Sequence, residues 1–412
     1  MKVHSAWSGH DCSFAVLDDG KPEVHAEYER YIREKEPAGD GVQFMFDELD
    51  DYDDIKYFAT CCSAKKIKNH KESFEKLNEI IDKNNGEFYI IGHHQCHAAN
   101  VFYSSNHEKA LIVTMDGGGF EPYPFVSHQT LNNCKDKNMT TAFTVWEGDG
   151  NKIEKTKIFP LNQINIGGVW TRCTRYIFKM QSGWPRGHQA GTVMAMAAFG
   201  DPDRFKEDFY RMLKYDSESV SFKPPNQPRG AYTGNDPVHP YLNKWALLAE
   251  SGEQNRFDLA AGLQAATEIY IKEIFTQLLD AYPQYDHLCI SGGVSLNSVV
   301  MGKMLGWFKD RLVDIYAPPT PHDGGLTLGA AQYVWHHILD NPRIEWKDNF
   351  TPYLGFSYDD IKSTLENYDN IIKYINKLHN SEIDNTTQIV NMYNMVCNIN
   401  YSTLLDYIKK IK

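Results

Sequence analysis

Two histidines four residues apart, His93 and His97, are the residues whose type and spacing most directly suggest chemistry. Residues four apart on an α-helix lie on one face with Cβ atoms about 5–6 Å apart, so two such imidazoles can share one divalent metal ion. An apolar run at 88–91 predicts a buried strand before the pair, and an Ala-rich run predicts a helix from Ala98 to Tyr103. The sequence therefore predicts a metal site that needs further ligands from elsewhere in the chain.

A carboxylate that could join this site, Asp116, follows the next apolar run, 111–115, and precedes three glycines. A carboxylate at a strand end next to glycines suits both a metal ion and a phosphate group. Three alternatives stay open at this point. The histidines could simply pack or face water, His94 could replace His93 as a ligand, and Cys96 could ligate rather than pack as a small apolar side chain.

Two later strand-to-helix connections combine glycines with a polar side chain. Gly292 and Gly293 follow a short strand and precede a helix, where backbone N–H groups can meet a nucleotide. Asn297 supplies an amide at the first turn of that helix. Asp323 stands just before a helix expected from Thr327 to His337, and it is the fourth candidate ligand. An ordinary glycine-rich strand-to-helix turn is the alternative interpretation of each connection.

Composition limits the classes of function. The 412 residues are 42% hydrophobic, which is enough for a large core in two or three lobes. The net charge of −12, from 54 acidic and 42 basic residues, argues against a protein that coats nucleic acid or anionic membrane by bulk charge. The clearest basic patch is the segment 65–71, for which a solvated surface is the favoured interpretation.

The eight cysteines are scattered, apart from Cys61 and Cys62, and no CxxC pair occurs. This usage is typical of a reduced, cytosolic protein without a disulfide framework. The N-terminus lacks the apolar region of a signal peptide, and no apolar run approaches the roughly 20 residues that span a bilayer. We therefore expect a soluble cytoplasmic protein with no membrane partner.

Two segments share one plan: a strand, a polar turn, a second strand and a hairpin turn containing Asp-Gly. Strands are expected at 2–7, 13–17 and 22–28 in the first copy, and at 111–115 and 141–146 in the second. The repeat indicates a duplication. It is the layout of the actin-like (ASKHA-type) ATPase fold, an α/β fold with two mixed five-stranded sheets flanked by helices, in which two such hairpins face each other across a nucleotide cleft.

Changes of composition predict three parts in the chain. Residues 1–110 form a first actin-like lobe, and residues 111–357 form a second lobe with a polar, Pro-rich insertion at about 201–256. Residues 358–412 are rich in Asn, Asp, Lys, Ile and Tyr, and they predict a tail of polar helices.

Taken together, these motifs resemble the O-carbamoyltransferase family typified by the nodulation-factor and antibiotic carbamoyltransferases. The matching motifs are Gly9-His10-Asp11-x-Ser13, Glu27-x-Glu29-Arg30, His93-xxx-His97-Ala98-Ala99, Asp116-Gly117-Gly118, Val193-Met194-Ala195-Met196-Ala197 with Gly200, Gly292-Gly293-Val294-x-Leu296-Asn297, and Asp323-x-Gly325 with Leu328-Gly329-Ala330-Ala331. In this order they are highly specific and cover roughly residues 5–357. This half of the family is similar to the protein that transfers threonylcarbamoyl to tRNA adenosine, which implies an actin-like fold that binds a nucleotide and one metal ion.

The resemblance implies an activity. Carbamoyl phosphate and ATP first give carbamoyl-adenylate, and an acceptor hydroxyl then attacks the carbamoyl carbon while AMP leaves. The implied metal ligands are His93, His97, Asp116 and Asp323. This mixed set suits iron(II), which we favour, with manganese and zinc as alternatives.

Other site residues follow from the same resemblance. His10 is the expected general base, since an alcohol needs a proton acceptor poised near neutrality, although a hydrogen-bonded turn histidine is the alternative. Asp11 and Lys35 complete the expected catalytic set. The residues expected to contact the nucleotide are Gly117, Gly118, Gly292, Gly293, Asn297 and Gly324.

The sequence departs from the family pattern in three places. Thr192 replaces the usual Lys and Ala195 the usual Gly of one helix, Glu36 replaces a basic residue, and the synthase-like second domain with its Gly-Arg-x-Glu-x-Gly-Pro-Arg-Ala-Leu-Gly motif is missing. We therefore expect a transfer half, a fragment, or a chain that depends on a separate synthase-like partner. A nucleotide- and metal-binding scaffold is the alternative of another class. A sugar-kinase-like ATPase is disfavoured, since such kinases hold Mg²⁺ with carboxylates and waters.

The acceptor is the least determined part of the prediction. The family acts on hydroxyls of sugars, antibiotics and, in phage-type members, hydroxymethylcytosine. Residues 120–140 and 183–256 are expected to shape the pocket, with aromatic and cationic side chains interleaved: Trp184, Tyr210, Phe222, Tyr232, Trp245, Arg186, Lys223 and Arg229. A surface insertion that packs its own aromatic side chains is the alternative interpretation of equal weight. The net charge favours a small-molecule or nucleotide acceptor over polymeric DNA, and a homodimer stays open.

Overall fold

The structure is a computed structural model, and it describes residues 1–122, 126–131, 138–160, 163–180, 189–221, 239–346 and 354. Residues Met1–Gly355 form one compact unit that contains both predicted lobes. The predicted helical tail lies outside the described residues, as do six of the expected acceptor-pocket residues: Trp184, Arg186, Phe222, Lys223, Arg229 and Tyr232.

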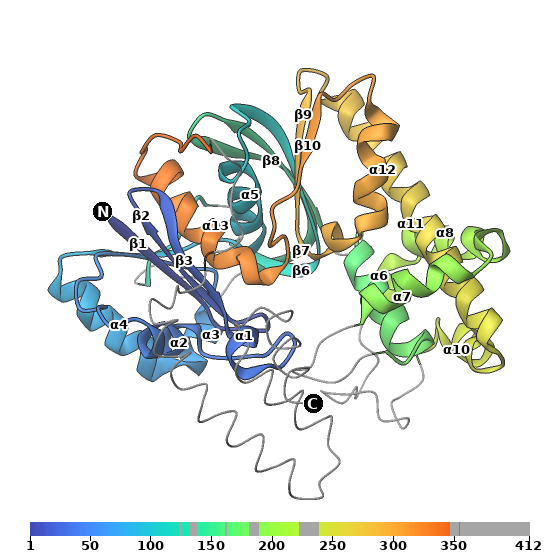
Figure 1. The fold of residues 1–412 in the computed structure, drawn as a ribbon, viewed down its shortest axis with the longest axis horizontal. Helices are drawn as coiled ribbons and strands as arrows, with labels where there is room; N and C mark the ends of the chain where they lie inside the picture. Colours follow the sequence, from blue (N-terminus) through green and yellow to red (C-terminus); the bar gives the residue numbers. More distant parts are fainter. Residues whose placement is uncertain are drawn as a thin grey trace, which may run out of the picture. The chain divides into compact units, whose positions relative to one another are not determined.

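Two five-stranded sheets form the framework (Figure 1). The first has the order β3-β2-β1-β4-β5 and the second the order β10-β9-β6-β7-β8. The strands of the first sheet are β1 (Lys2–Trp7), β2 (Ser13–Asp18), β3 (Lys21–Glu27), β4 (Tyr57–Thr60) and β5 (Glu87–Ile90). Those of the second are β6 (Lys109–Pro122), β7 (Asn138–Asp149), β8 (Lys152–Pro160), β9 (His287–Ser291) and β10 (Asp314–Tyr316).

The two sheets have the same topology. In each, the first three strands in chain order form an antiparallel meander, and the fourth pairs in parallel with the first. The fifth then pairs in parallel with the fourth. The central strands of both sheets carry buried apolar residues, as strands covered on both faces do. The predicted duplication and the actin-like α/β fold class are confirmed.

The helices fill the connections between strands. In the first half they are α1 (Tyr28–Ile32), α2 (Gly41–Glu48), α3 (Ala64–Asn69), α4 (Lys71–Lys83) and α5 (His93–Tyr103). In the second half they are α6 (Ile166–Arg172), α7 (Ala190–Met196), α8 (Lys206–Tyr215), α9 (Ser217–Ser221), α10 (Asn243–Glu250), α11 (Glu253–Ala281), α12 (Ser298–Phe308) and α13 (Leu326–Gln332). Shorter 3₁₀ and π turns are η2 (Cys173–Ile177), η3 (Ala197–Phe199), η4 (Pro202–Arg204), η5 (Gly293–Leu296), η6 (Asp323–Gly325) and η7 (Tyr333–Ile338).

Helices α5 and α13 join the two sheets. α5 packs on β6 and β9 of the second sheet, α13 packs on β1 and β2 of the first, and the two helices pack on each other (Figure 1). A Cβ atom on Gly329 would collide with the backbone carbonyl of Cys96, so a glycine lets the two helix backbones approach closely. This helix pair carries or adjoins most of the candidate site residues.

Two predicted element boundaries were wrong. The helix that bears His93 and His97 begins at His93, not at Ala98, because Gly92 is its N-cap and the histidines form its first turns. Asp116 does not end its strand in a turn. β6 continues to Pro122, and its register with β7 shifts between Met115 and Gly119, so the intervening residues bulge out of the ladder.

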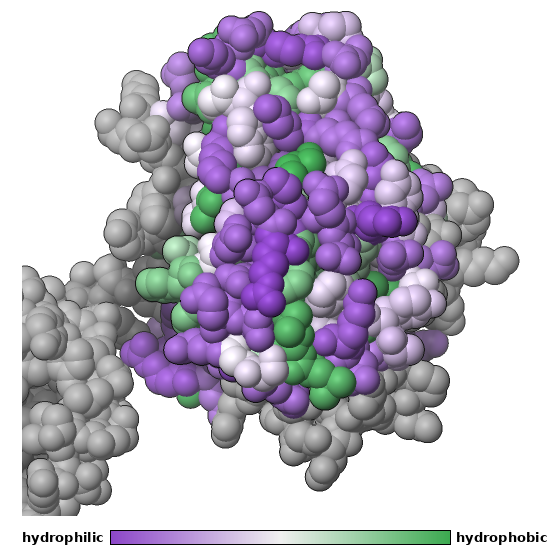
Figure 2. Space-filling model, turned by 90° about the vertical axis from the view of Figure 1, so that its right-hand side faces the viewer, coloured by the Kyte–Doolittle hydropathy of each residue, from purple (hydrophilic) through white to green (hydrophobic). Residues whose placement is uncertain are grey.

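The described part of the predicted insertion is helical and packs on α11. Trp245 is buried there and stacks on Phe209, with ring centroids 5.7 Å apart. For Trp245 the alternative interpretation, an insertion that packs its own aromatic side chains, is the correct one, because its ring belongs to the hydrophobic core. The outer face that carries α8 and α10 to α12 is mainly hydrophilic, with hydrophobic side chains in small islands (Figure 2).

Among the described residues, no helix is both long enough and apolar enough to cross a membrane.

Candidate metal and nucleotide site

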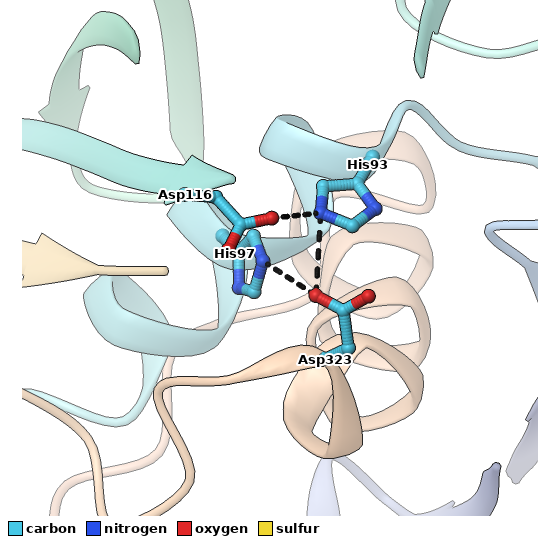
Figure 3. Close-up of side chains that lie close together, drawn as sticks. All are labelled: His93, His97, Asp116 and Asp323. Carbon is cyan, nitrogen blue, oxygen red and sulfur yellow. Dashed lines mark hydrogen bonds and ion pairs between the residues drawn. The ribbon is translucent and has the colours of Figure 1, made fainter. Parts of the chain in front are cut away.

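Four side chains predicted as metal ligands converge at the junction of the two sheets (Figure 3). His93, His97, Asp116 and Asp323 each offer one ligand atom, and these atoms lie within 4.8 Å of one another. His93 Nε2 lies 3.0 Å from Asp116 Oδ2 and 3.4 Å from Asp323 Oδ1. His97 Nε2 lies 3.5 Å from the same Asp323 oxygen. We call these four residues the ligand cluster.

Three elements bring the ligand cluster together. α5 presents His93 and His97 on one face, since they are one turn apart. The bulge in β6 places Asp116 beside them. The short turn η6, which precedes α13, supplies Asp323 from residues more than 200 positions further along the chain. The cluster therefore exists only when β6, α5 and α13 have packed.

The residues of the cluster fit a metal ion. His97 is fully buried, yet within the described part of the chain its Nδ1 has no hydrogen-bond partner and its Nε2 has only the long 3.5 Å contact with Asp323. An unsatisfied buried polar group is costly and calls for an explanation such as a bound ion. Two imidazoles and two carboxylates form a donor set that suits a divalent transition metal such as iron, manganese or zinc.

The two alternative ligands have other roles. His94 Nε2 donates to the backbone carbonyl of Thr141 at 2.8 Å, so its Nδ1 accepts from the Thr114 hydroxyl at 2.6 Å. Burial lowers the pKa of His94 to about 3, which keeps this ring neutral and fully engaged. Cys96 is buried, and burial raises the pKa of its thiol, so Cys96 packs as a neutral side chain.

Opposite charges shift the pKa values in the cluster. Burial disfavours the charged form of His93, but Asp323 and Asp116 outweigh this effect and raise its pKa well above the usual value. Burial likewise opposes ionisation of Asp116, but the hydrogen bond and charge of His93 lower its pKa well below the usual value. For Asp323, burial is again outweighed by His93 and His10, and the pKa falls. Both carboxylates are therefore ionised at neutral pH and attract cations.

A second group of side chains adjoins the cluster at Asp323. His10 Nδ1 donates to Asp11 Oδ2 at 2.8 Å, and His10 Nε2 lies 3.4 Å from Asp323 Oδ2. His322 continues the chain of contacts, 3.7 Å from Asp11 and 3.3 Å from Glu27. Burial lowers the pKa of His10, but Asp323 and Asp11 outweigh it and raise that pKa to about 9. The structure thus brings the predicted catalytic residues His10 and Asp11 next to the predicted metal ligands.

Lys35, the third predicted catalytic residue, is in a different environment. Its side chain is 60% exposed, and its ammonium lies 3.8 Å from the Glu36 carboxylate. A catalytic role for Lys35 stays a prediction.

Two of the glycine segments predicted for the nucleotide lie side by side. The backbone N–H of Gly293 donates to Asp116 Oδ1 at 3.1 Å, so the connection after β9 touches the bulge of β6. Gly292 has φ +95° and packs against the Met115 carbonyl, a conformation and a contact that only glycine tolerates there. Among the described residues, a Cβ atom at Gly117 would meet only the Gly167 backbone, at 3.9 Å. Gly117 therefore leaves room at the bulge where a ligand can approach the backbone.

The other two positions are engaged within the protein. Asn297 caps α12 by accepting from the N–H of Val300, and it pairs with Gln264 through both atoms of its amide. The N–H of Gly324 donates to His322 Nδ1, and its carbonyl accepts from Ser13 and His25. Contacts of Asn297 and Gly324 with a nucleotide stay predictions, and the partners seen here compete with them.

Sequence reasoning missed two contributors, Glu121 and His322. Glu121 is buried and accepts hydrogen bonds from the first turn of α5. No sequence pattern near Glu121 predicts this contact. His322 directly precedes Asp323 and contacts Asp11. Its position beside a candidate ligand was the one signal available.

The fold and the site together define an actin-like protein with a candidate metal centre between its duplicated halves. The chain belongs to the carbamoyltransferase family, because the family model described as "Carbamoyltransferase N-terminus" matches residues 64–332. That match includes all four residues of the ligand cluster.

Curated relatives agree with this membership. The chain is 26% identical to an uncharacterised protein of Synechocystis sp. over 308 residues, which cover 72% of this chain and 45% of the relative. It is 27% identical over 250 residues to the nodulation protein NolO of Bradyrhizobium diazoefficiens, covering 59% of this chain and 38% of the relative. For the nodulation protein NolNO of Sinorhizobium fredii the identity is 25% over 358 residues, covering 78% and 46%. The chain thus spans about half the length of these relatives or less.

Solved structures show more distant similarity. HypF of T. kodakarensis aligns with a TM-score of 0.42 and 12% identity, over 81% of this chain and 48% of that chain. The activator of 2-hydroxyisocaproyl-CoA dehydratase from Clostridium difficile, solved with bound ADPNP, aligns with a TM-score of 0.41 and 12% identity, over 81% and 94%. These values are low, and the fold class rests on the sheet topology.

Proposed function

We propose that this chain is the transfer half of an ATP-dependent O-carbamoyltransferase. It would move a carbamoyl group from carbamoyl-adenylate, made from carbamoyl phosphate and ATP, to a hydroxyl of a small-molecule, sugar or nucleotide acceptor. The observation that carries this proposal is the ligand cluster, which lies within the residues matched by the carbamoyltransferase family. Because the chain covers less than half of each of these relatives, a separate synthase-like domain or protein is the proposed source of the adenylate.

His93, His97, Asp116 and Asp323 would hold one divalent metal ion, with iron(II) favoured over manganese and zinc. Such an ion supplies Lewis-acid chemistry, which polarises a carbonyl or phosphoryl oxygen. The protein positions the ligands from three packed elements and buries both histidines. This burial limits the access of water, which strengthens electrostatic interactions at the site.

His10 is the proposed acceptor of the hydroxyl proton. Its side chain is 45% exposed, so an incoming acceptor can reach it, and Asp11 orients its ring through Nδ1. With a pKa of about 9, His10 is protonated at neutral pH as long as no cation is bound to Asp323. When Asp323 binds a cation, its carboxylate raises the pKa of His10 less, and the imidazole then becomes available as a base.

The nucleotide is proposed to lie against the bulge of β6 and the connection after β9. Gly117 leaves room at the bulge, and Gly293 reaches the bulge through its hydrogen bond to Asp116. Backbone N–H groups at glycine-rich strand ends are suited to phosphate oxygens. The two lobes predicted at 1–110 and 111–357 are proposed as the two sides of this site.

The test is a carbamoylation assay on the full chain, loaded anaerobically with iron(II) and supplied directly with carbamoyl-adenylate. The acceptors are a panel of sugars, hydroxymethyl-dCMP and hydroxymethylated DNA, and mass spectrometry detects the added carbamoyl group. We expect product with a sugar or nucleotide, and its loss in His10→Ala. Product on DNA with a steep salt dependence would instead identify the alternative acceptor, 5-hydroxymethylcytosine in DNA. No product on any hydroxyl, with the adenylate intact, would favour the scaffold hypothesis.

A further inference from the structure

One lysine of the basic segment 65–71 is placed differently from its neighbours. Lys66 folds back from α3 onto the first sheet, and its ammonium lies 3.3 Å from the centre of the Trp7 ring. Lys65 and Lys68, by contrast, are exposed. An ammonium over an indole face is held by a cation–π interaction. The structure therefore fixes one positive charge of this segment at a defined place.

That place adjoins the ligand cluster. Trp7 is buried, and its ring meets the His93 imidazole edge-on with centroids 6.2 Å apart. The indole N–H of Trp7 donates to the carbonyl of His10 at 2.7 Å, which ties the same ring to the turn that carries His10 and Asp11. One indole thus connects the Lys66 ammonium to both groups of side chains described above.

Gly9 makes room for the ammonium. A Cβ atom at Gly9 would lie 2.5 Å from Lys66 Nζ and 2.5 Å from Trp7 Cζ2. A larger residue would therefore displace the lysine from the ring. The residue after Gly9 is His10, whose Nε2 lies 3.4 Å from Asp323 of the cluster.

The negative charge of the site gives a cation beside it a role. Asp11, Asp116 and Asp323 place three carboxylates at the site, and they repel any anionic substrate. Across the described residues, no carboxylate forms an ion pair or hydrogen bond with the Lys66 ammonium, so none of them neutralises its charge. Lysine is a compact, strongly hydrated point charge of the kind that commonly binds phosphate.

We propose that Lys66 binds a phosphate group of the substrate beside the ligand cluster, with Trp7 holding its ammonium in place. This inference rests on the proposed function and specifies how that site receives its anionic substrate. The phosphate belongs either to the acyl phosphate donor or to the nucleotide, which share the same chemistry. Lys66 acts as a binding residue and takes no part in bond making.

The test is calorimetric titration of the metal-loaded full chain with carbamoyl phosphate, inorganic phosphate and AMP in separate experiments. Lys66→Ala should weaken binding of at least one of these by about tenfold or more, and Lys66→Arg should restore most of it because it keeps the charge. Lys65→Ala is the matched control, since it removes an exposed neighbouring charge, and it should change the Kd by less than about twofold. A selective effect on carbamoyl phosphate or on AMP identifies which phosphate Lys66 holds.

Equal affinity of Lys66→Ala and the wild type for all three ligands would overturn the proposal, as would equal losses in Lys65→Ala and Lys66→Ala. Metal affinity, titrated beforehand, should be the same in both variants. If the wild type binds no transition metal ion but phosphate binding still depends on Lys66, the phosphate site stands and the metal part of the proposed function is contradicted.

Discussion

The backbone N–H of His94 donates a hydrogen bond of 2.6 Å to Oε1 of Glu121. The same oxygen accepts from the N–H of Gln95 at 3.3 Å, so a buried carboxylate on β6 caps the first turn of α5. A negative charge at a helix N-terminus is favourable because it meets unpaired N–H groups and the positive end of the helix dipole. A Cβ atom on Gly92 would collide with this carboxylate. Glu121 thereby ties the helix that carries His93 and His97 to the strand that carries Asp116.

The first prediction concerns this tie. Glu121→Ala should weaken metal binding by about tenfold or more, because α5 would no longer be held in register with β6. Glu121→Gln keeps an acceptor oxygen and should retain part of the affinity. Glu154→Ala, which changes an exposed carboxylate on β8, is the control. Calorimetric metal titration checks the prediction. Unchanged affinity in Glu121→Ala, with the fold intact by circular dichroism, would contradict the positioning role.

The second prediction concerns His97. Its ring is buried, and among the described residues its only polar contact is the 3.5 Å approach of Nε2 to Asp323, so metal ligation would satisfy its nitrogens best. His97→Ala should lower metal affinity by at least about tenfold and abolish the rise in Tm that metal produces. His287→Ala, at a histidine paired with Asp286 outside the cluster, should leave both unchanged. Elemental analysis of anaerobically prepared wild type should find about one transition metal ion per chain. Its absence, together with no binding on addition, would refute the metal site.

The third prediction concerns pH. Although burial opposes it, Asp323 and Asp116 raise the pKa of His93 well above its usual value, so the metal-free protein holds a proton there at neutral pH. A metal ion at Nε2 must displace this proton, and His10 can lose a second one when Asp323 binds the ion, so binding should release between one and two protons and strengthen as pH rises from about 6 to 8. Manganese titrations in buffers of different ionisation enthalpy measure both effects. Binding that releases no proton and does not depend on pH would show that His93 is not a ligand.

The fourth prediction concerns the nucleotide. Gly117 leaves room at the bulge, so Gly117→Asp fits sterically and places a negative charge where phosphates are proposed to lie. We expect AMP and ATP analogues to bind the wild type and to lose about tenfold or more in affinity in this variant. Gly302→Asp on α12 is the matched control, because among the described residues a Cβ atom there meets nothing within 4 Å. Equal binding by wild type and Gly117→Asp would place the nucleotide elsewhere.

The sequence alone determined the duplicated fold and the identity of the candidate ligands. Strand periodicity and the two Asp-Gly hairpins are local features, so the repeat could be found before any packing was known. The spacing of His93 and His97 is equally local, since four residues make one turn of helix. Asp116 and Asp323 were found because each stands beside glycines next to a predicted strand or helix.

Only the tertiary structure decided how neighbouring polar residues divide their roles. His93 and His94 are adjacent in the chain, yet the first faces Asp116 and Asp323 while the second bonds to Thr114 and Thr141. Lys65 and Lys66 differ in the same way, and Trp245 proved to be a core residue. The physical reason is that the role of a buried polar side chain depends on which groups it contacts. Those partners, Glu121 for α5 and Trp7 for Lys66, come from distant segments that meet only when α5, α13 and the two sheets pack together.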